Sequence, residues 1–182
     1  MYKRQEHPNI SIEIYSESTQ RIAQKINDFS IDAGILYYNG GDRDTTVKLY
    51  EERYVFIAPK ALITSKEKEI TWAEVAQIPL CLLTPNMKNR QLIDEHFLDL
   101  EISPKIVTEA SDFTAVLAQV AGGNAAKIAP VSVAETFLDL KSTIQLDLTH
   151  PIMTHSVGLS IKDQSPALPM IEALRRAVQL AL

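Results

Sequence analysis

Apolar residues recur along this chain with two periods, every second residue in short runs and every third or fourth residue in longer ones. In residues 10–14, isoleucine alternates with polar residues, which predicts a half-buried strand. The side-chain oxygens of Ser18 and Thr19 can cap a helix behind this strand. Residues 31–37 are mostly apolar and predict a second strand. The chain therefore opens with a predicted strand–helix–strand unit, which we expect to be parallel and right-handed.

The run Leu80–Leu83 has four apolar residues in succession and predicts a strand that is buried on both faces. Thr84 and Pro85 end it, because proline has no amide hydrogen for the sheet. Asn86 is expected to cap a helix over residues 87–98. The backbone N–H groups at such a junction can bind a carboxylate or a small oxyanion. The alternative is an ordinary strand-to-helix junction.

The same patterns repeat through the rest of the chain. A capping box is expected at Thr71 and Glu74, which would begin a short helix. Further strands are expected at residues 47–52, 54–58, 105–109, 127–130, 144–148 and 156–161, and further helices at 113–121, from 132 and from 169 onward. Because strands and helices alternate, the expected fold class is α/β with two mostly parallel sheets. Residues 1–57 with 157–182 are expected to form one lobe and residues 58–156 the other, joined by two chain crossings.

Composition narrows the function further. The net charge of −5 argues against a nucleic-acid-binding surface on this chain. The single cysteine, Cys81, lies in an apolar run and is interpreted as a core residue. The four histidines share no metal-ligand spacing, so neither a metal nor a cofactor is expected. No apolar run reaches 18 residues and no apolar signal core follows Met1, so we expect a cytoplasmic protein without membrane contact.

Short polar side chains follow many of the predicted strands. In open α/β folds, ligands bind beyond the carboxyl ends of the strands, often between lobes. These positions predict a cleft for a polar ligand. They are Ser18, Thr19, Tyr37, Thr84, Asn86, Ser111 and Ser132.

The order of these motifs resembles the effector-binding domain of LysR-type transcriptional regulators over essentially the whole chain. The resemblance rests on the opening strand–helix–strand pattern, on a crossover strand that ends at Pro59, and on the final strand and helix. It also rests on the segment from Val120 through Gly122 and Gly123 to Pro130, which is similar to a glycine-and-proline segment of that family.

The resemblance implies a two-lobed, periplasmic-binding-protein-like fold and no catalysis. It implies that a small polar or anionic metabolite binds between the lobes. The implied effector-binding residues are Ser18, Thr19, Tyr37, Thr84, Pro85, Asn86, Ser111, Pro130 and Ser132. The implied partners are a second copy of the chain, in a homodimer that becomes a tetramer in the full-length protein, and DNA through an N-terminal domain that is absent here. A solute-binding protein of a transport system is the alternative, and an enzyme on the same fold is a third hypothesis.

The chain departs from the family pattern in two places. The family usually has Gly-x-Gly before the strand that ends at the proline, where this chain has residues 123–127, Gly-Asn-Ala-Ala-Lys. The ammonium of Lys127 either lies near the cleft and favours an anionic effector or extends to solvent. The family's first strand also has no counterpart. We therefore expect the strands at residues 10–15 and 31–36 to pair with each other or to be covered by a second chain. In either case the fragment is expected to bind effector weakly or not at all.

Overall fold

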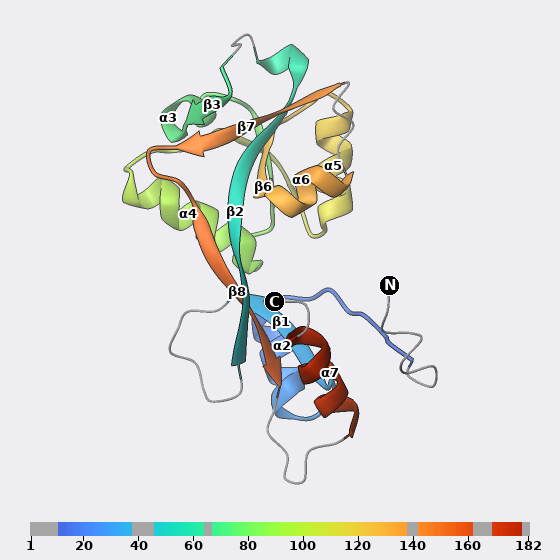
Figure 1. Ribbon diagram of the computed structural model, residues 1–182. Helices are drawn as coiled ribbons and strands as arrows, with labels where there is room; N and C mark the ends of the chain where they lie inside the picture. The colour runs from blue at the N-terminus through green and yellow to red at the C-terminus, as the bar shows by residue number, and fades with distance from the viewer. Residues whose placement is uncertain (1–10, 38–45, 64–66, 138–141, 162–168, 180–182) are drawn as a thin grey trace. The chain divides into compact units, whose positions relative to one another are not determined.

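The computed structural model describes residues 11–37, 46–63, 67–137, 142–161 and 169–179 (Figure 1). The described strands are β1 (Ala33–Tyr37), β2 (Thr46–Pro59), β3 (Glu69–Thr71), β4 (Leu80–Leu83), β5 (Ile106–Ala110), β6 (Lys127–Pro130), β7 (Thr143–Thr149) and β8 (Thr154–Ile161). The described α-helices are α2 (Thr19–Asn27), α3 (Trp72–Val75), α4 (Lys88–Asp99), α5 (Phe113–Ala121), α6 (Val131–Phe137) and α7 (Pro169–Gln179), with a short 3-10 helix at Lys60–Leu62.

The chain divides into two compact units. The first contains Met1–Glu51 and Ser156–Leu182, and the second contains Glu52–His155. The chain therefore passes between the units twice, once within β2 and once within β8. The first passage comes earlier in the chain than the 57/58 boundary expected from the sequence.

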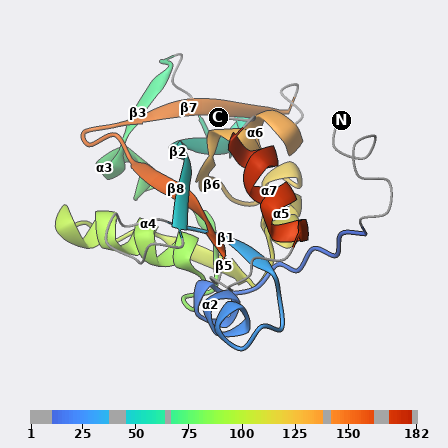
Figure 2. The same cartoon turned by 60° about the horizontal axis from the view of Figure 1, so that its bottom comes forward.

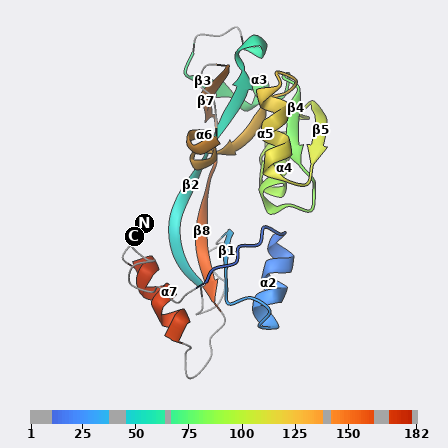
Figure 3. The same cartoon turned by 90° about the vertical axis from the view of Figure 1, so that its right-hand side faces the viewer.

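In the first unit, α2 and α7 lie on opposite faces of a short sheet (Figure 3). The period of two along β1 explains this arrangement, because successive side chains of a strand point to opposite faces. Ala33 packs in a cluster with Leu159 and Ile171, on the α7 side. At Gly34, an added Cβ would lie only 2.5 Å from a methyl group of Ile22 in α2. Glycine is therefore what lets α2 approach the strand so closely.

The second unit holds the larger core. The inner half of β2 is fully buried from Tyr54 to Ala58, and it pairs antiparallel with both β6 and β7. The parallel pair β4–β5 lies beside β6. In Figure 2, α4 lies along one side of this unit, and α5 and α6 lie together on the other side. All four residues of β4 are buried, as expected from their apolar run.

Most of the expected elements are present, but three expectations are wrong. Residues 11–18 form no strand, and Ile12 and Ile14 are 77% and 89% exposed. Consequently no opening parallel strand–helix–strand unit forms, and β1 instead pairs antiparallel with β8. The two expected pieces at residues 47–58 are one continuous strand, β2. The sheets are mixed rather than mostly parallel, because β2 has antiparallel partners on both sides.

Candidate functional site

Three parallel strand ends meet at one edge of the second unit. β4 pairs with β5 on one side, and the amide of Thr84 donates to the carbonyl of Ala110 at 3.0 Å. On the other side, Leu80 forms a parallel bridge with Ala126, the residue that precedes β6. The carboxyl ends of β4, β5 and β6 therefore lie side by side, and we call this part of the unit the strand-end edge.

Three of the expected binding residues of the second unit lie at this edge, since Thr84 directly follows β4, Ser111 directly follows β5, and Asn86 comes two residues after Thr84. Thr84 is half-buried, whereas Asn86 and Ser111 are exposed. Within the described part of the chain, the hydroxyl groups of Thr84 and Ser111 and the side-chain amide of Asn86 make no intramolecular hydrogen bond. These polar groups are therefore available to a ligand.

The remaining expected residues of this unit have other environments. Pro85 is exposed, and its carbonyl accepts a hydrogen bond from the side chain of Gln91 at 3.1 Å. Pro130 is buried as the last residue of β6. Ser132 is exposed and lies within the first turn of α6, so the expectation that it caps this helix is wrong.

The expected helix cap at Asn86 is also wrong. The N-cap of α4 is Met87, which has no side-chain capping bond. The turn after β4 is closed by the backbone instead, since the amide of Met87 donates to the carbonyl of Thr84 at 3.0 Å. Asn86 is left on the outside of this turn. By contrast, Asp112 caps α5 by accepting from the amide of Ala115 at 2.9 Å.

In the first unit, the expected binding residues stand at the start of a helix and the end of a strand. Ser18 is the N-cap of α2, and its hydroxyl accepts from the amide of Arg21 at 3.4 Å. Thr19 is the first residue of that helix, and Tyr37 is the last residue of β1. All three side chains are half-buried.

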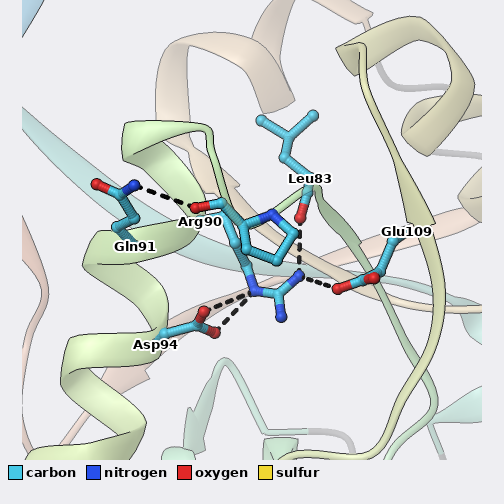
Figure 4. A network of polar contacts seen from close by, with 6 residues as sticks. Leu83, Arg90, Gln91, Asp94 and Glu109 are labelled. Atoms are coloured by element: carbon cyan, nitrogen blue, oxygen red, sulfur yellow. Dashed lines mark hydrogen bonds and ion pairs between the residues drawn. The ribbon is translucent and has the colours of Figure 1, made fainter. Parts of the chain in front are cut away.

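A buried arginine, which sequence reasoning missed, holds the strand-end edge together (Figure 4). Arg90 is only 7% exposed, and its Nε donates to both carboxylate oxygens of Asp94 at 2.8 and 2.9 Å. Its Nη1 donates to the carbonyl of Leu83 at 2.8 Å and to the carboxylate of Glu109. One guanidinium therefore ties α4 to the ends of β4 and β5.

The ionisation of Arg90 follows from these contacts. Burial disfavours its charge, but the hydrogen bonds with Glu109 and Asp94 outweigh that effect and hold the pKa of the guanidinium above its usual value. The part of this network that the sequence could have revealed is the ion pair of Arg90 and Asp94, which are four residues apart on a predicted helix. Glu109 could not be found in this way, because it comes from a different strand.

Lys127 is the second charged residue in this part of the unit. Its side chain is 2% exposed, so the expectation that it extends to solvent is wrong. Its Nζ lies 4.0 Å from the centre of the Phe113 ring, and no hydrogen-bond acceptor contacts it within the described residues. Burial lowers the pKa of this amine to about 7, and the opposing influence of Cys81 is smaller. Burial also raises the pKa of the Cys81 thiol.

A cluster of rings lies elsewhere in the second unit, and it too was missed. The ring of His96 stacks on Trp72 at 5.2 Å and meets His155 edge-on at 5.7 Å. Tyr54 also meets His155 edge-on, and its hydroxyl accepts from the side-chain amide of Asn89 at 2.9 Å. These residues are far apart in the sequence, so no local pattern connects them.

The described residues contain no group of three or more histidine, cysteine, aspartate or glutamate side chains placed to hold a metal ion. None of their helices is both long enough and apolar enough to cross a membrane.

Comparison with known proteins identifies the family. The family model for the LysR substrate binding domain matches residues 3–182. This chain belongs to that family. The resemblance noted in the sequence is thereby confirmed, as is the α/β, periplasmic-binding-protein-like fold class.

Solved structures with low sequence identity share the fold of this LysR substrate-binding domain. The effector-binding domain of QuiR in complex with shikimate is 20% identical, with a TM-score of 0.79, over 97% of this chain and 83% of that one. The regulatory domain of CcmR from Synechocystis PCC6803, in complex with 2-PG, is 11% identical, with a TM-score of 0.84, over 97% and 86%. Full-length CbnR complexed with its target DNA is 16% identical, with a TM-score of 0.78, over 98% and 63%.

A curated relative is longer than this domain. A probable RuBisCO transcriptional regulator from Trieres chinensis is 25% identical over 147 residues, which are 76% of this chain and 48% of that protein. The matched part of this chain thus spans about half the length of that relative.

Proposed function

We propose that this LysR substrate-binding domain senses a small polar or anionic effector, and that the strand-end edge of the second unit supplies part of the binding site. The observation that carries the proposal is the juxtaposition of β4, β5 and β6, which presents Thr84, Asn86 and Ser111 without intramolecular partners. Such groups at the carboxyl ends of parallel strands suit a ligand with hydrogen-bonding oxygens.

The Arg90 network supports this assignment. A binding group must be held in place before the ligand arrives, since ordering it on binding weakens the affinity. Arg90 fixes the last carbonyl of β4 directly before Thr84, and it fixes Glu109 close to Ser111. In the first unit, Ser18, Thr19 and Tyr37 are the residues that we propose to contribute to effector binding.

We further propose that the domain acts within a longer transcriptional regulator. Its DNA contacts would come from another part of that protein, and a second copy of the chain would be its partner in a homodimer. Membership of the LysR substrate-binding family supports this role over that of a transport solute-binding protein, as does the greater length of the curated relative. The domain would perform no catalysis, because effector sensing requires only binding that favours one conformation.

Substitution of Thr84 tests the proposed site. Shikimate and 2-PG, the ligands of QuiR and CcmR, are the first probes in a set of small carboxylates and phosphates. For a probe that binds the wild-type protein, Thr84→Ala should lower the affinity by roughly 10- to 100-fold in calorimetry, since a hydrogen bond to a charged group contributes about 1.5–3 kcal/mol. The exposed Thr154 of the same unit gives the matched control, Thr154→Ala. Equal affinities for Thr84→Ala and wild type would contradict the proposal.

A further inference from the structure

Lys127 carries a buried amine close to the start of α5. It is the first residue of β6 and pairs with Ile57 of β2. Its Nζ lies under the ring of Phe113, which is the first residue of α5 and follows closely on the end of β5. Phe113 also packs against a cluster of buried residues that includes Leu83, the last residue of β4. The amine of Lys127 therefore lies against the residue that begins α5, three positions after the end of β5.

The surroundings of this amine are apolar. Phe113 packs against two clusters of buried residues. One contains Val55, Ile57, Val120, Ala129 and Ala134, and the other contains Cys81, Leu83, Val116 and Ala125. Within the described part of the chain, the thiol of Cys81 is the only titratable group whose charge influences Lys127. The carboxylate of Glu109 binds Arg90, and that of Asp112 caps α5. No carboxylate of these residues neutralises the ammonium.

An ammonium with neither a hydrogen-bond acceptor nor an ionic partner is unfavourable in such a place. Transfer of a charge out of water costs several kcal/mol unless another charge compensates for it. The face of Phe113 compensates only in part, since a cation–π contact contributes about 0.5–2 kcal/mol. Replacing such a group by a well-packed apolar side chain of similar volume is often neutral or stabilising. A buried ionisable amine without a polar partner, next to a proposed site, is a candidate for ligand binding.

We propose that the effector of this domain carries an anionic group, a carboxylate, phosphate or sulfate, and that this group displaces the ring of Phe113 and becomes the ionic partner of Lys127. The inference rests on the proposed function and adds to it the chemical class of the ligand. Thr84, Asn86 and Ser111 would hold the polar remainder of the effector, and Lys127 would discriminate against neutral analogues. Phe113, which is half-buried, is the side chain that must move.

Lysine side-chain NMR on the whole 182-residue chain tests this proposal. Lys127→Met identifies the Lys127 resonance by its loss, and the variant should fold, because it removes a buried charge and preserves most of the volume. Sulfate is the inorganic probe, since its charge does not change near neutral pH. It should shift the Lys127 resonance saturably and raise the pH midpoint of that amine above its free value of about 7. Above pH 7, sulfate affinity should fall about tenfold per pH unit in the wild-type protein, because the protonated fraction of the amine falls by that factor. In Lys127→Met, the affinity for sulfate should be weak and independent of pH.

A matched pair of organic probes tests selectivity. Shikimate and its methyl ester differ in one negative charge, so the acid should bind more tightly to wild type, and Lys127→Met should abolish that preference. The proposal is overturned if the ester binds as tightly as the acid, if sulfate shifts the surface lysines as much as Lys127, or if Lys127 titrates like an exposed lysine. If Thr84→Ala weakens binding while Lys127→Met has no effect, the effector site stands and the anionic inference fails. If neither substitution has an effect, both proposals fail.

Discussion

Arg90 on α4 donates a hydrogen bond from Nη1 to the carbonyl of Leu83, the last residue of β4, at 2.8 Å. This bond joins a helix to the strand end that directly precedes Thr84. The same guanidinium also holds the carboxylates of Asp94 and Glu109. The geometry of the proposed site therefore depends on a residue that need not touch the effector.

Arg90→Lys should destabilise the second unit. A lysine has no planar group that can hold Asp94, Glu109 and the Leu83 carbonyl together. Both carboxylates are partly exposed, so water can replace much of the lost interaction, and we expect a loss of about 1–3 kcal/mol in the free energy of unfolding. Denaturation followed by the fluorescence of Trp72, the only tryptophan and a buried one, reports on this unit.

The control for Arg90 is an exposed ion pair. Arg176→Ala removes the Arg176–Glu172 pair on the surface of α7, and its effect should be below about 0.5 kcal/mol. A loss in Arg90→Lys no larger than that in Arg176→Ala would show that the buried network contributes nothing to stability.

Gly34→Ala should destabilise the first unit through crowding. The added Cβ would lie 2.5 Å from Ile22 Cγ2 and 2.9 Å from Ile26 Cδ1. Side chains can shift more easily than backbone, so we expect a loss of about 1–3 kcal/mol. Thermal unfolding followed by circular dichroism measures this loss. Ile22→Ala removes the nearest methyl group, so the double variant should lose less than the sum of the two single losses. Strict additivity would disprove this contact as the cause.

The capping box of α3 should make stability depend on pH. The amide and hydroxyl of Thr71 donate to Glu74 at 2.8 and 2.7 Å, and the backbone bond is the larger cause that lowers the pKa of this carboxyl below its usual value of 4.5. A carboxyl with a lowered pKa in the folded state stabilises it above the unfolded pKa. That contribution is lost as pH falls below 4.5 through the folded value. Glu74→Gln should therefore flatten the fall in stability over this range, which denaturant titrations from pH 6 to pH 3 would measure.

Thr71→Ala provides a second test of the capping box. It should cost about 0.5–2 kcal/mol at neutral pH, since it removes the side-chain cap of α3. An identical pH dependence in wild type and Glu74→Gln would mean that Glu74 has no such role.

Exposed isoleucines in the first unit should promote self-association. Ile12 and Ile14 project into solvent from a segment without strand pairing, and Ile35 is exposed on β1, which has a single neighbouring strand, β8, among the described residues. Exposed apolar side chains near the edge of a sheet favour pairing with another chain. Ile12→Ser with Ile14→Ser should lower the apparent mass in concentration-dependent light scattering, whereas the exposed Leu98 in the other unit offers a control in Leu98→Ser. Equal association in both variants would refute this assignment.

The sequence determined the elements whose signals are local. Four consecutive apolar residues predict the buried strand β4, because both faces of such a strand are apolar and are removed from water only inside a core. The box of Thr71 and Glu74 begins α3, and Asp112 and Gly122 bracket α5, because capping bonds connect residues only three or four positions apart. The family, too, could be recognised from the order of these motifs.

Tertiary structure decided what depends on distant partners. The alternation at residues 10–14 predicts a strand, but a strand needs a neighbour, and β1 pairs with β8 instead. Likewise, β2 takes antiparallel partners that lie 70 to 76 residues further along the chain in β6 and 84 to 92 residues further along in β7. The environments of the charged residues also depend on distant segments. Lys127 is buried because it lies between β2 and α5. The charge of Arg90 on α4 is neutralised in part by Glu109 on β5. Burial and charge pairing arise from contacts between remote segments, and local periodicity carries no information about those contacts.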